Sequence, residues 1–277
     1  IAHDGDGDRA VFFDERGEYV DGAASLAALA AAELDAGDAT VSAVNVSQRL
    51  VDVCEAAGAD LELTPIGSTR IMTRIRELEA AGRSVPVAGE GNGGVIFPGY
   101  RVTRDGAYTG ARFLELVAER PASEVIEPYD GYANVRVNVA YDDEAEREAL
   151  LAAASERADA ANADLTTIDG YRLDYGDGWV LARPSGTEPV VRVYAEARSE
   201  DRARELADSM AGAPFAAGAE ERAPFGVTNY DSSSAASIRS RSARASASAS
   251  STVPSATRSR SASLSSVRAS ADSRRSS

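Results

Sequence analysis

Apolar runs of strand length alternate with amphipathic segments of helix length over most of this sequence. The runs at 10–13 and 19–20 predict two short strands, because charged residues and glycines that favour turns bound each of them. A helix is expected over 22–36, with leucines on one face and Gly37 as its stop.

The alternation is regular between residues 40 and 120. Each apolar run there is followed by a segment with helical spacing, which is typical of a parallel sheet covered by helices. The expected strands cover 40–46, 60–64 and 85–89, and the expected helices follow Ser47, follow the segment 66–69, and cover 107–120.

The pattern changes after residue 121, where strands outnumber helices. The expected elements are a strand at 133–141, a helix opened by the acids 142–144, strands within 164–175 and 179–183 joined by the turn 176–178, a strand at 190–197, and a helix capped by Ser199. This order favours a separate α+β domain.

Beyond Gly212 no periodicity is visible, and a composition of Ser, Ala and Arg offers too little apolar surface to offset the entropy of ordering. The sequence therefore predicts an α/β protein in four parts. These are the end of one α/β domain (1–20), a complete parallel α/β/α domain (21–121), an α+β C-terminal domain (122–212) and a disordered Ser/Arg-rich tail (213–277).

The charge balance narrows the possible partners. The chain contains no lysine, so all 29 basic residues are arginines, set against 44 acidic residues for a net charge of −15. This acidity is typical of a salt-adapted, halophilic proteome and disfavours nucleic acid as a partner. No apolar run long enough for a membrane span and no signal peptide is visible, so we expect a soluble, cytoplasmic protein without a membrane partner.

Three aspartates alternate with glycines in the loop Asp4-Gly5-Asp6-Gly7-Asp8-Arg9. Converging carboxylates favour a hard cation such as Mg²⁺ or Ca²⁺, and Arg9 adds a fixed positive charge that suits a phosphate ligand. A solvated acidic turn and a calcium loop remain alternatives. A calcium loop would place glycine where Arg9 stands, although Glu15 fits its twelfth position.

Two further polar loops follow strands. Gly89-Glu90-Gly91-Asn92-Gly93-Gly94 offers a carboxylate and an amide, a pair that suits the vicinal hydroxyls of a sugar. The segment from Arg183 to Pro189 offers Ser185, Gly186 and Thr187 as donors beside an arginine, which favours a phosphate. Either loop could instead be an ordinary surface turn.

The three loops, in this order and at these separations, resemble the α-D-phosphohexomutase superfamily, which includes phosphomannomutase, phosphoglucomutase and phosphoglucosamine mutase. The first loop is similar to its metal loop, the second to its sugar loop and the third to its phosphate loop. The resemblance covers about residues 1–212, and the chain looks like the C-terminal portion of an archaeal-type member.

The resemblance implies a four-domain isomerase that moves a phosphoryl group between C1 and C6 of a hexose phosphate, through a phosphoserine and a hexose bisphosphate. Domains 1 and 2 would be missing partners of this chain. The implied residues are Asp4, Asp6 and Asp8 for Mg²⁺, Arg9 beside the phosphoserine, Glu90 and Asn92 for sugar hydroxyls, and Arg183, Ser185, Gly186 and Thr187 for the phosphate that is not transferred. Arg192, on the strand that follows, would add a second positive charge.

The sequence departs from the family in two places. The Ser-His-Asn segment that carries the phosphoserine does not occur, so we expect this chain to be inactive alone, as a truncated or split gene product. The sugar loop ends in Asn-Gly-Gly where many bacterial relatives have Ser-Gly-His, which leaves the preferred hexose open. The alternatives are a phosphoglucosamine mutase and a non-catalytic calcium- or sugar-binding module. The single histidine, His3, is expected to be structural.

Overall fold

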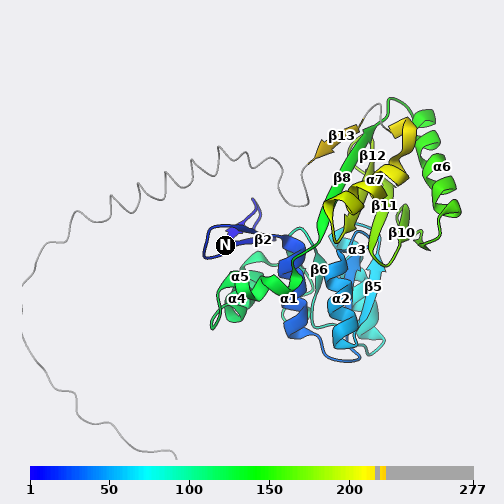
Figure 1. Cartoon of the computed structure of the whole chain (residues 1–277). Coiled ribbons are helices and arrows are strands. Elements are labelled where there is room, and N and C mark those ends of the chain that lie inside the picture. Colours follow the sequence, from blue (N-terminus) through cyan, green and yellow to red (C-terminus); the bar gives the residue numbers. More distant parts are fainter. Residues whose placement is uncertain (216–218, 223–277) are drawn as a thin grey trace, which may run out of the picture. The chain divides into compact units, whose positions relative to one another are not determined.

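The predicted alternation of strands and helices is present in the computed structural model, which describes residues 1–215 and 219–222 (Figure 1). The chain has a mixed α/β fold. In this described part of the sequence, no helix has both the length and the apolar character that a membrane crossing requires.

A small antiparallel sheet opens the chain. It contains β1 (Ala2–His3), β2 (Ala10–Phe13) and β3 (Tyr19–Val20), and the residues between β1 and β2 form the predicted metal loop. Phe12 is buried and stacks on Phe113, with 3.9 Å between the ring centroids. This contact fixes the hairpin that carries the aspartates to the body of the protein.

The next elements follow the expected order of strands and helices. They are α1 (Gly22–Glu33), β4 (Ala39–Ala43), α2 (Gln48–Ala57), β5 (Asp60–Thr64), α3 (Ser68–Ala80), β6 (Ala88–Glu90), β7 (Gly94–Ile96) and α4 (Gly106–Leu116). β4 and β5 pair in parallel, whereas β6 and β7 form an antiparallel hairpin. The predicted strand 85–89 is therefore shorter and shifted, because the chain reverses within the glycine-rich loop.

Several boundaries differ from the sequence prediction: β4 ends at Ala43 instead of residue 46, and α4 ends at Leu116 instead of residue 120. α1 ends at Glu33 instead of residue 36, because Leu34 is already extended and the Asp38 carboxylate accepts a hydrogen bond from the Asp35 amide at 2.8 Å. The segment after Pro121, for which the sequence predicts no helix or strand before residue 133, forms the short helices α5 (Ala122–Ile126) and η1 (Glu127–Tyr129). Val125 and Ile126 are buried in the core of the first region, which explains the helical order there.

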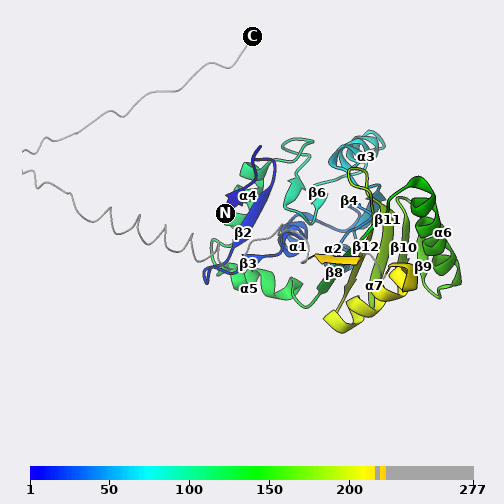
Figure 2. The same cartoon turned by 90° about the horizontal axis from the view of Figure 1, so that it is seen from above.

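A six-stranded antiparallel sheet forms the second region. Its strands are β8 (Ala133–Ala140), β9 (Asp164–Thr166), β10 (Tyr171–Asp174), β11 (Gly178–Pro184), β12 (Val190–Ala197) and β13 (Ala219–Arg222), in the spatial order β13-β8-β12-β11-β10-β9. The helices α6 (Glu144–Ala160) and α7 (Glu200–Phe215) cover one face of this sheet (Figure 2).

Within residues 1–215 and 219–222, no helix of the second region lies on the other face of this sheet, which packs against the first region. Trp179, Leu181 and Tyr194 on that face share a buried cluster with Val44, which follows β4. The buried Arg172 also donates to the carbonyl oxygens of Val44 and Val46, at 2.6 and 3.1 Å. The helix-free face therefore lies over the carboxyl end of β4.

The C-terminal boundary also differs from the prediction. α7 continues to Phe215 instead of ending at Gly212, because a glycine permits a helix end without imposing one. β13 then pairs with the open edge of β8, which would otherwise present unpaired backbone groups. The rest of the predicted tail, 216–218 and 223–277, lies outside the described residues.

Candidate functional site

The three aspartates of the first loop converge as the sequence predicts. One carboxylate oxygen from each of Asp4, Asp6 and Asp8 lies within 4.8 Å of the others. Arg9 donates from its backbone and its Nε to the Asp4 carboxylate, at 3.2 and 2.6 Å. The hydrogen bond from the Arg9 side chain is the main reason that the pKa of Asp4 is lowered to about 2.

The loop is held in place from α4. The Gly106 amide donates to the Gly7 carbonyl oxygen at 3.1 Å, and the His3 Nδ1 lies 3.0 Å from the Arg9 carbonyl oxygen. A Cβ at Gly106 would lie 2.6 Å from the carbonyl oxygens of Gly7 and Arg9, so only glycine fits against the loop. His3 contacts the loop backbone, in agreement with the structural role expected for it.

The predicted sugar loop is the turn of the β6–β7 hairpin. Asn92 Oδ1 accepts a hydrogen bond from the Gly94 amide at 3.0 Å, and Gly93 has a positive φ of 88°. Burial raises the pKa of the Glu90 carboxyl, against the opposing effect of the nearby Arg104. The loop therefore presents a partly buried carboxylate beside an amide that shapes the turn.

The metal and sugar loops lie against each other. The Ala10 amide donates to the Gly93 carbonyl oxygen at 3.0 Å. Arg104 joins them a second time, because its guanidinium forms an ion pair with Asp8 and another with Glu90, the latter at 3.5 Å. Two loops more than 80 residues apart in sequence thus share one arginine.

Arg104 was not identified from the sequence. It stands directly before the helix cap Asp105 and fourteen residues after Glu90, where no spacing rule connects it to either loop. The sequence carries no local signal for it, because a residue before the cap lies outside the helix and the cap itself, Asp105, is a usual choice.

The predicted phosphate loop connects β11 to β12. Ser185 Oγ accepts from the amides of Thr187 and Glu188, at 3.4 and 3.2 Å, so two of the loop's N–H donors point at one hydroxyl. Arg192 forms an ion pair with Glu188, and Arg183 Nε lies 3.1 Å from Asp169 Oδ2. Both arginines of the prediction therefore lie at this loop.

Several buried polar atoms on the helix-free face have no hydrogen-bond partner among the described residues. They include Nε of Arg136, Arg183 and Arg192 and Oδ1 of Asn138. Strand pairing sets Arg183 opposite Arg192, and Arg192 opposite Asn138, in one row across β11, β12 and β8. Three guanidinium groups whose Nε makes no hydrogen bond gather on one face and favour an anionic ligand, although Arg183 and Arg192 also form ion pairs with Asp169 and Glu188.

The structure brings the first two loops together but records no bond between them and the third. Over residues 1–215 and 219–222, no hydrogen bond or ion pair links the segment 183–192 to the metal or sugar loop. A separate surface cavity of about 410 Å³, lined by Arg49, Tyr129 and Tyr132 among others, includes no residue of the three loops.

Two protein-family models match the chain. The alpha/beta/alpha domain III of phosphoglucomutase/phosphomannomutase matches residues 21–132, and the C-terminal domain of the same family matches residues 134–213. The two matches follow each other in chain order and together include the sugar loop and the phosphate loop.

Full-length relatives show the same similarity. A phosphoglucomutase/phosphomannomutase from Thermococcus kodakarensis is 36% identical over 74% of this chain and 44% of its own length. A probable phosphoglucosamine mutase from Methanopyrus kandleri is 37% identical over 76% of this chain and 46% of its own length. The crystal structure of a phosphoglucomutase/phosphomannomutase family protein from Burkholderia thailandensis matches with a TM-score of 0.64 and 28% identity, over 75% of this chain and 44% of that chain.

Fold, loops and relatives together define a member of the α-D-phosphohexomutase superfamily, whose enzymes are isomerases. The chain belongs to its phosphoglucomutase/phosphomannomutase family, of which it carries domain III and the C-terminal domain. It spans about half the length of the curated relatives it matches.

Proposed function

We propose that this chain supplies the metal, sugar and distal-phosphate subsites of a phosphohexomutase that transfers phosphate between C1 and C6 of a hexose phosphate. The observation that carries the proposal is the Asp8–Arg104–Glu90 bridge, which places a predicted metal ligand and a predicted sugar ligand at one guanidinium. A transferring phosphoryl group must meet both cation and sugar, so these two loops have to be neighbours.

The aspartate loop fits a magnesium ion. Its three carboxylates offer hard oxygen ligands within 4.8 Å of one another, and Asp8 Oδ1 is buried without a hydrogen-bond partner among the described residues. Bound Mg²⁺ would neutralise charge on the transferring phosphoryl group. Arg9, held on Asp4, is the residue that would orient the phosphoserine of the complete enzyme.

The other two subsites bind the rest of the substrate. Glu90 and Asn92 would accept and donate hydrogen bonds to sugar hydroxyls. Arg183, Ser185, Gly186, Thr187 and Arg192 would hold the phosphate that is not transferred. A preference for hexosamine phosphates is a second candidate, because several of the similar full-length proteins are named probable phosphoglucosamine mutases.

The domain assignment belongs to the same proposal. Residues 1–20 would close domain 2, 21–121 would form domain 3, and 122–212 would form domain 4. Val125 and Ile126 are buried in the core of the first region of the fold. Their burial favours moving the boundary between domains 3 and 4 from residue 121 to about residue 132, where the match to domain III also ends.

The chain alone is proposed to be inactive, because its 277 residues contain no Ser-His-Asn segment to carry the phosphoryl group. Turnover of mannose 1-phosphate or glucose 1-phosphate by the purified chain would contradict this. Activity that appears on adding domains 1 and 2 of the same enzyme would support it.

Calorimetric titration tests the subsites without requiring activity. We expect glucose 6-phosphate to bind and unphosphorylated glucose to bind far more weakly, since the arginines recognise the phosphate. Mg²⁺ should bind weakly, because three carboxylates supply about half of its six oxygen ligands. Micromolar Ca²⁺ binding with no need for a phosphorylated sugar would favour a calcium- or sugar-binding module instead.

A further inference from the structure

The Nε edge of the Arg183 guanidinium lies against the carboxylate of Asp169. The Arg183 side chain is 12% exposed, and its Nε lies 3.1 Å from Asp169 Oδ2, although the N–H is not directed at that oxygen. No hydrogen bond joins its two terminal nitrogens to any residue that the structure describes. A nearly buried arginine with its outer edge unoccupied is suited to an anion.

Asp169 is itself anchored in the first region of the fold. The same Oδ2 accepts a hydrogen bond from the Ile66 amide at 3.0 Å, in the segment between β5 and α3. Gly170, which follows it, has a φ of 94°, and a Cβ there would lie 2.2 Å from the Ala182 carbonyl oxygen and 2.7 Å from the Arg183 Cβ. The turn that carries Asp169 therefore sits directly on the backbone of Arg183.

We propose that Asp169 is a positioning residue that holds Arg183 so that its outer edge faces the substrate phosphate. The proposal rests on the proposed function, since it takes Arg183 as a phosphate ligand. A free arginine side chain loses rotamer entropy when it is ordered, and a partner that orders it beforehand removes that cost from binding.

Charge alone predicts the opposite effect. A carboxylate near an anion site repels the anion, so neutralising Asp169 would strengthen phosphate binding if repulsion dominated. Orientation dominates here, because Asp169 is paired with Arg183 itself and also engaged by the Ile66 amide. The sign of the effect therefore separates the two mechanisms.

The test uses the 277-residue chain and calorimetric titration with glucose 6-phosphate and with inorganic phosphate. Asp169→Asn keeps the size of the side chain and an acceptor for the Ile66 amide, and should weaken binding about tenfold, because the Arg183 guanidinium loses the ion pair that orders it. The matched control is Asp177→Asn, which removes one of the two acidic partners of Arg202 at the β10–β11 turn and should leave phosphate affinity unchanged.

A double-mutant cycle separates positioning from general damage to the fold. In the Arg183→Ala background, Asp169→Asn should have no further effect on phosphate affinity, because its action passes through Arg183. Three outcomes would each overturn the proposal while leaving the phosphate role of Arg183 in place. They are an additive loss of affinity in the double variant, an unchanged phosphate affinity in Asp169→Asn, and a tighter phosphate affinity in Asp169→Asn. No phosphate binding by the unaltered chain would overturn both.

Discussion

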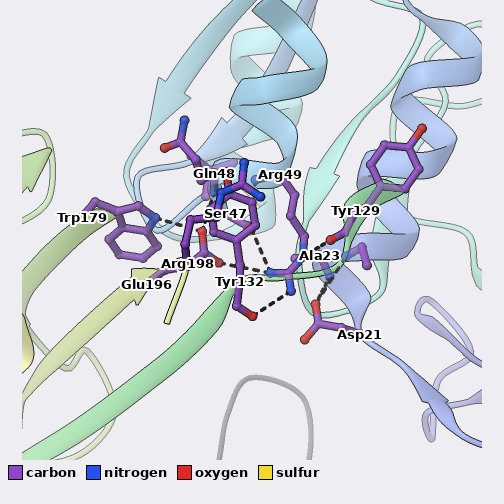
Figure 3. A network of polar contacts seen from close by, with 12 residues as sticks. Asp21, Ala23, Ser47, Gln48, Arg49, Tyr129, Tyr132, Trp179, Glu196 and Arg198 are labelled. Carbon is purple, nitrogen blue, oxygen red and sulfur yellow. Dashed lines mark hydrogen bonds and ion pairs between the residues drawn. The ribbon is translucent and has the colours of Figure 1, made fainter. Parts of the chain in front are cut away.

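Glu196 and Arg49 form a buried ion pair between the two regions of the fold, with 3.3 Å between Oε2 and Nη1 and side chains 1% and 5% exposed. Figure 3 shows the surrounding network, in which Glu196 Oε1 also accepts from the Gln48 amide at 2.6 Å and from Trp179 Nε1 at 3.2 Å. Glu196 of β12 thus satisfies an amide at the start of α2, the helix that follows β4.

Removing this carboxylate should destabilise the protein strongly. Glu196→Ala leaves Arg49 buried without its counter-charge, and breaking a buried pair from one side costs about 3–5 kcal/mol. The free energy of unfolding from urea titration measures the loss. Glu196→Gln should lose less, because its amide oxygen still accepts from Gln48 and Trp179.

An exposed ion pair supplies the control. Glu77 pairs with Arg74 on the surface of α3, where both side chains are more than a third exposed. Glu77→Gln should change the free energy of unfolding by less than about 1 kcal/mol. Equal losses in Glu77→Gln and Glu196→Ala would show that the buried pair contributes nothing specific.

Arg183→Ala should weaken binding of glucose 6-phosphate by about 2–3 kcal/mol, the scale of a charge-assisted bond to a desolvated anion. Metal affinity should stay the same, because Arg183 makes no contact with the aspartate loop. Arg202→Ala is the matched control, since Arg202 pairs with Asp177 away from the phosphate loop. Equal phosphate affinity in Arg183→Ala and the parent would remove the phosphate role from this loop.

Much of the fold follows from local sequence signals. Ser47 caps α2 through a hydrogen bond to the Arg49 amide at 3.2 Å, as the sequence predicts, and β12 covers the predicted residues 190–197. The reversal within the sugar loop was missed, because an apolar run before glycines does not reveal which strand pairs with which. Register and pairing are non-local properties of the chain.

The same limit applies to the site. The three loops could be found because each gathers its polar residues within seven positions of sequence. Arg104 and Asp169 could not be found, since each acts on residues far along the chain: Arg104 on Asp8, and Asp169 on Ile66. Single positioning residues leave no local pattern, and only the three-dimensional structure identifies them.

Sugar-phosphate binding should weaken in acid as Glu90 is protonated. Burial raises the pKa of Glu90 above its ordinary value of 4.5, so the carboxylate is lost at a higher pH than for an exposed glutamate. Because the folded state holds this proton more tightly than the unfolded state, protonation of Glu90 favours folding in acid, so binding is lost without any loss of the fold through this group.

The acid limb of the binding profile is the pH range in which binding of the sugar phosphate is lost as the pH falls. It should move to higher pH in Arg104→Ala, because the Arg104 charge opposes the rise in the Glu90 pKa. Calorimetry with glucose 6-phosphate across the pH range measures the shift. Glu90→Gln is the control, in which only the titration of the ligand's own phosphate remains. An acid limb at the same pH in Arg104→Ala and the parent would contradict the coupling between the two side chains.

Gly106→Ala should lower the free energy of unfolding by about 1–3 kcal/mol, the usual cost of forcing an extra methyl group into a packed site. Its Cβ would lie 2.6 Å from the carbonyl oxygens of Gly7 and Arg9 and 2.7 Å from His3 Nδ1, so the metal loop must shift. Helix propensity acts in the opposite direction, because alanine is favoured over glycine within a helix by up to about 1 kcal/mol.

The sign of the change therefore shows which effect wins at the start of α4. Gly99→Ala is the matched control, since nothing lies within 4 Å of its added Cβ, and it should be nearly neutral. Mg²⁺ titration of the same variants provides a second reading, because a displaced hairpin separates Asp4, Asp6 and Asp8. If Gly106→Ala were as stable as the parent and bound Mg²⁺ equally, α4 would not hold the metal loop in place.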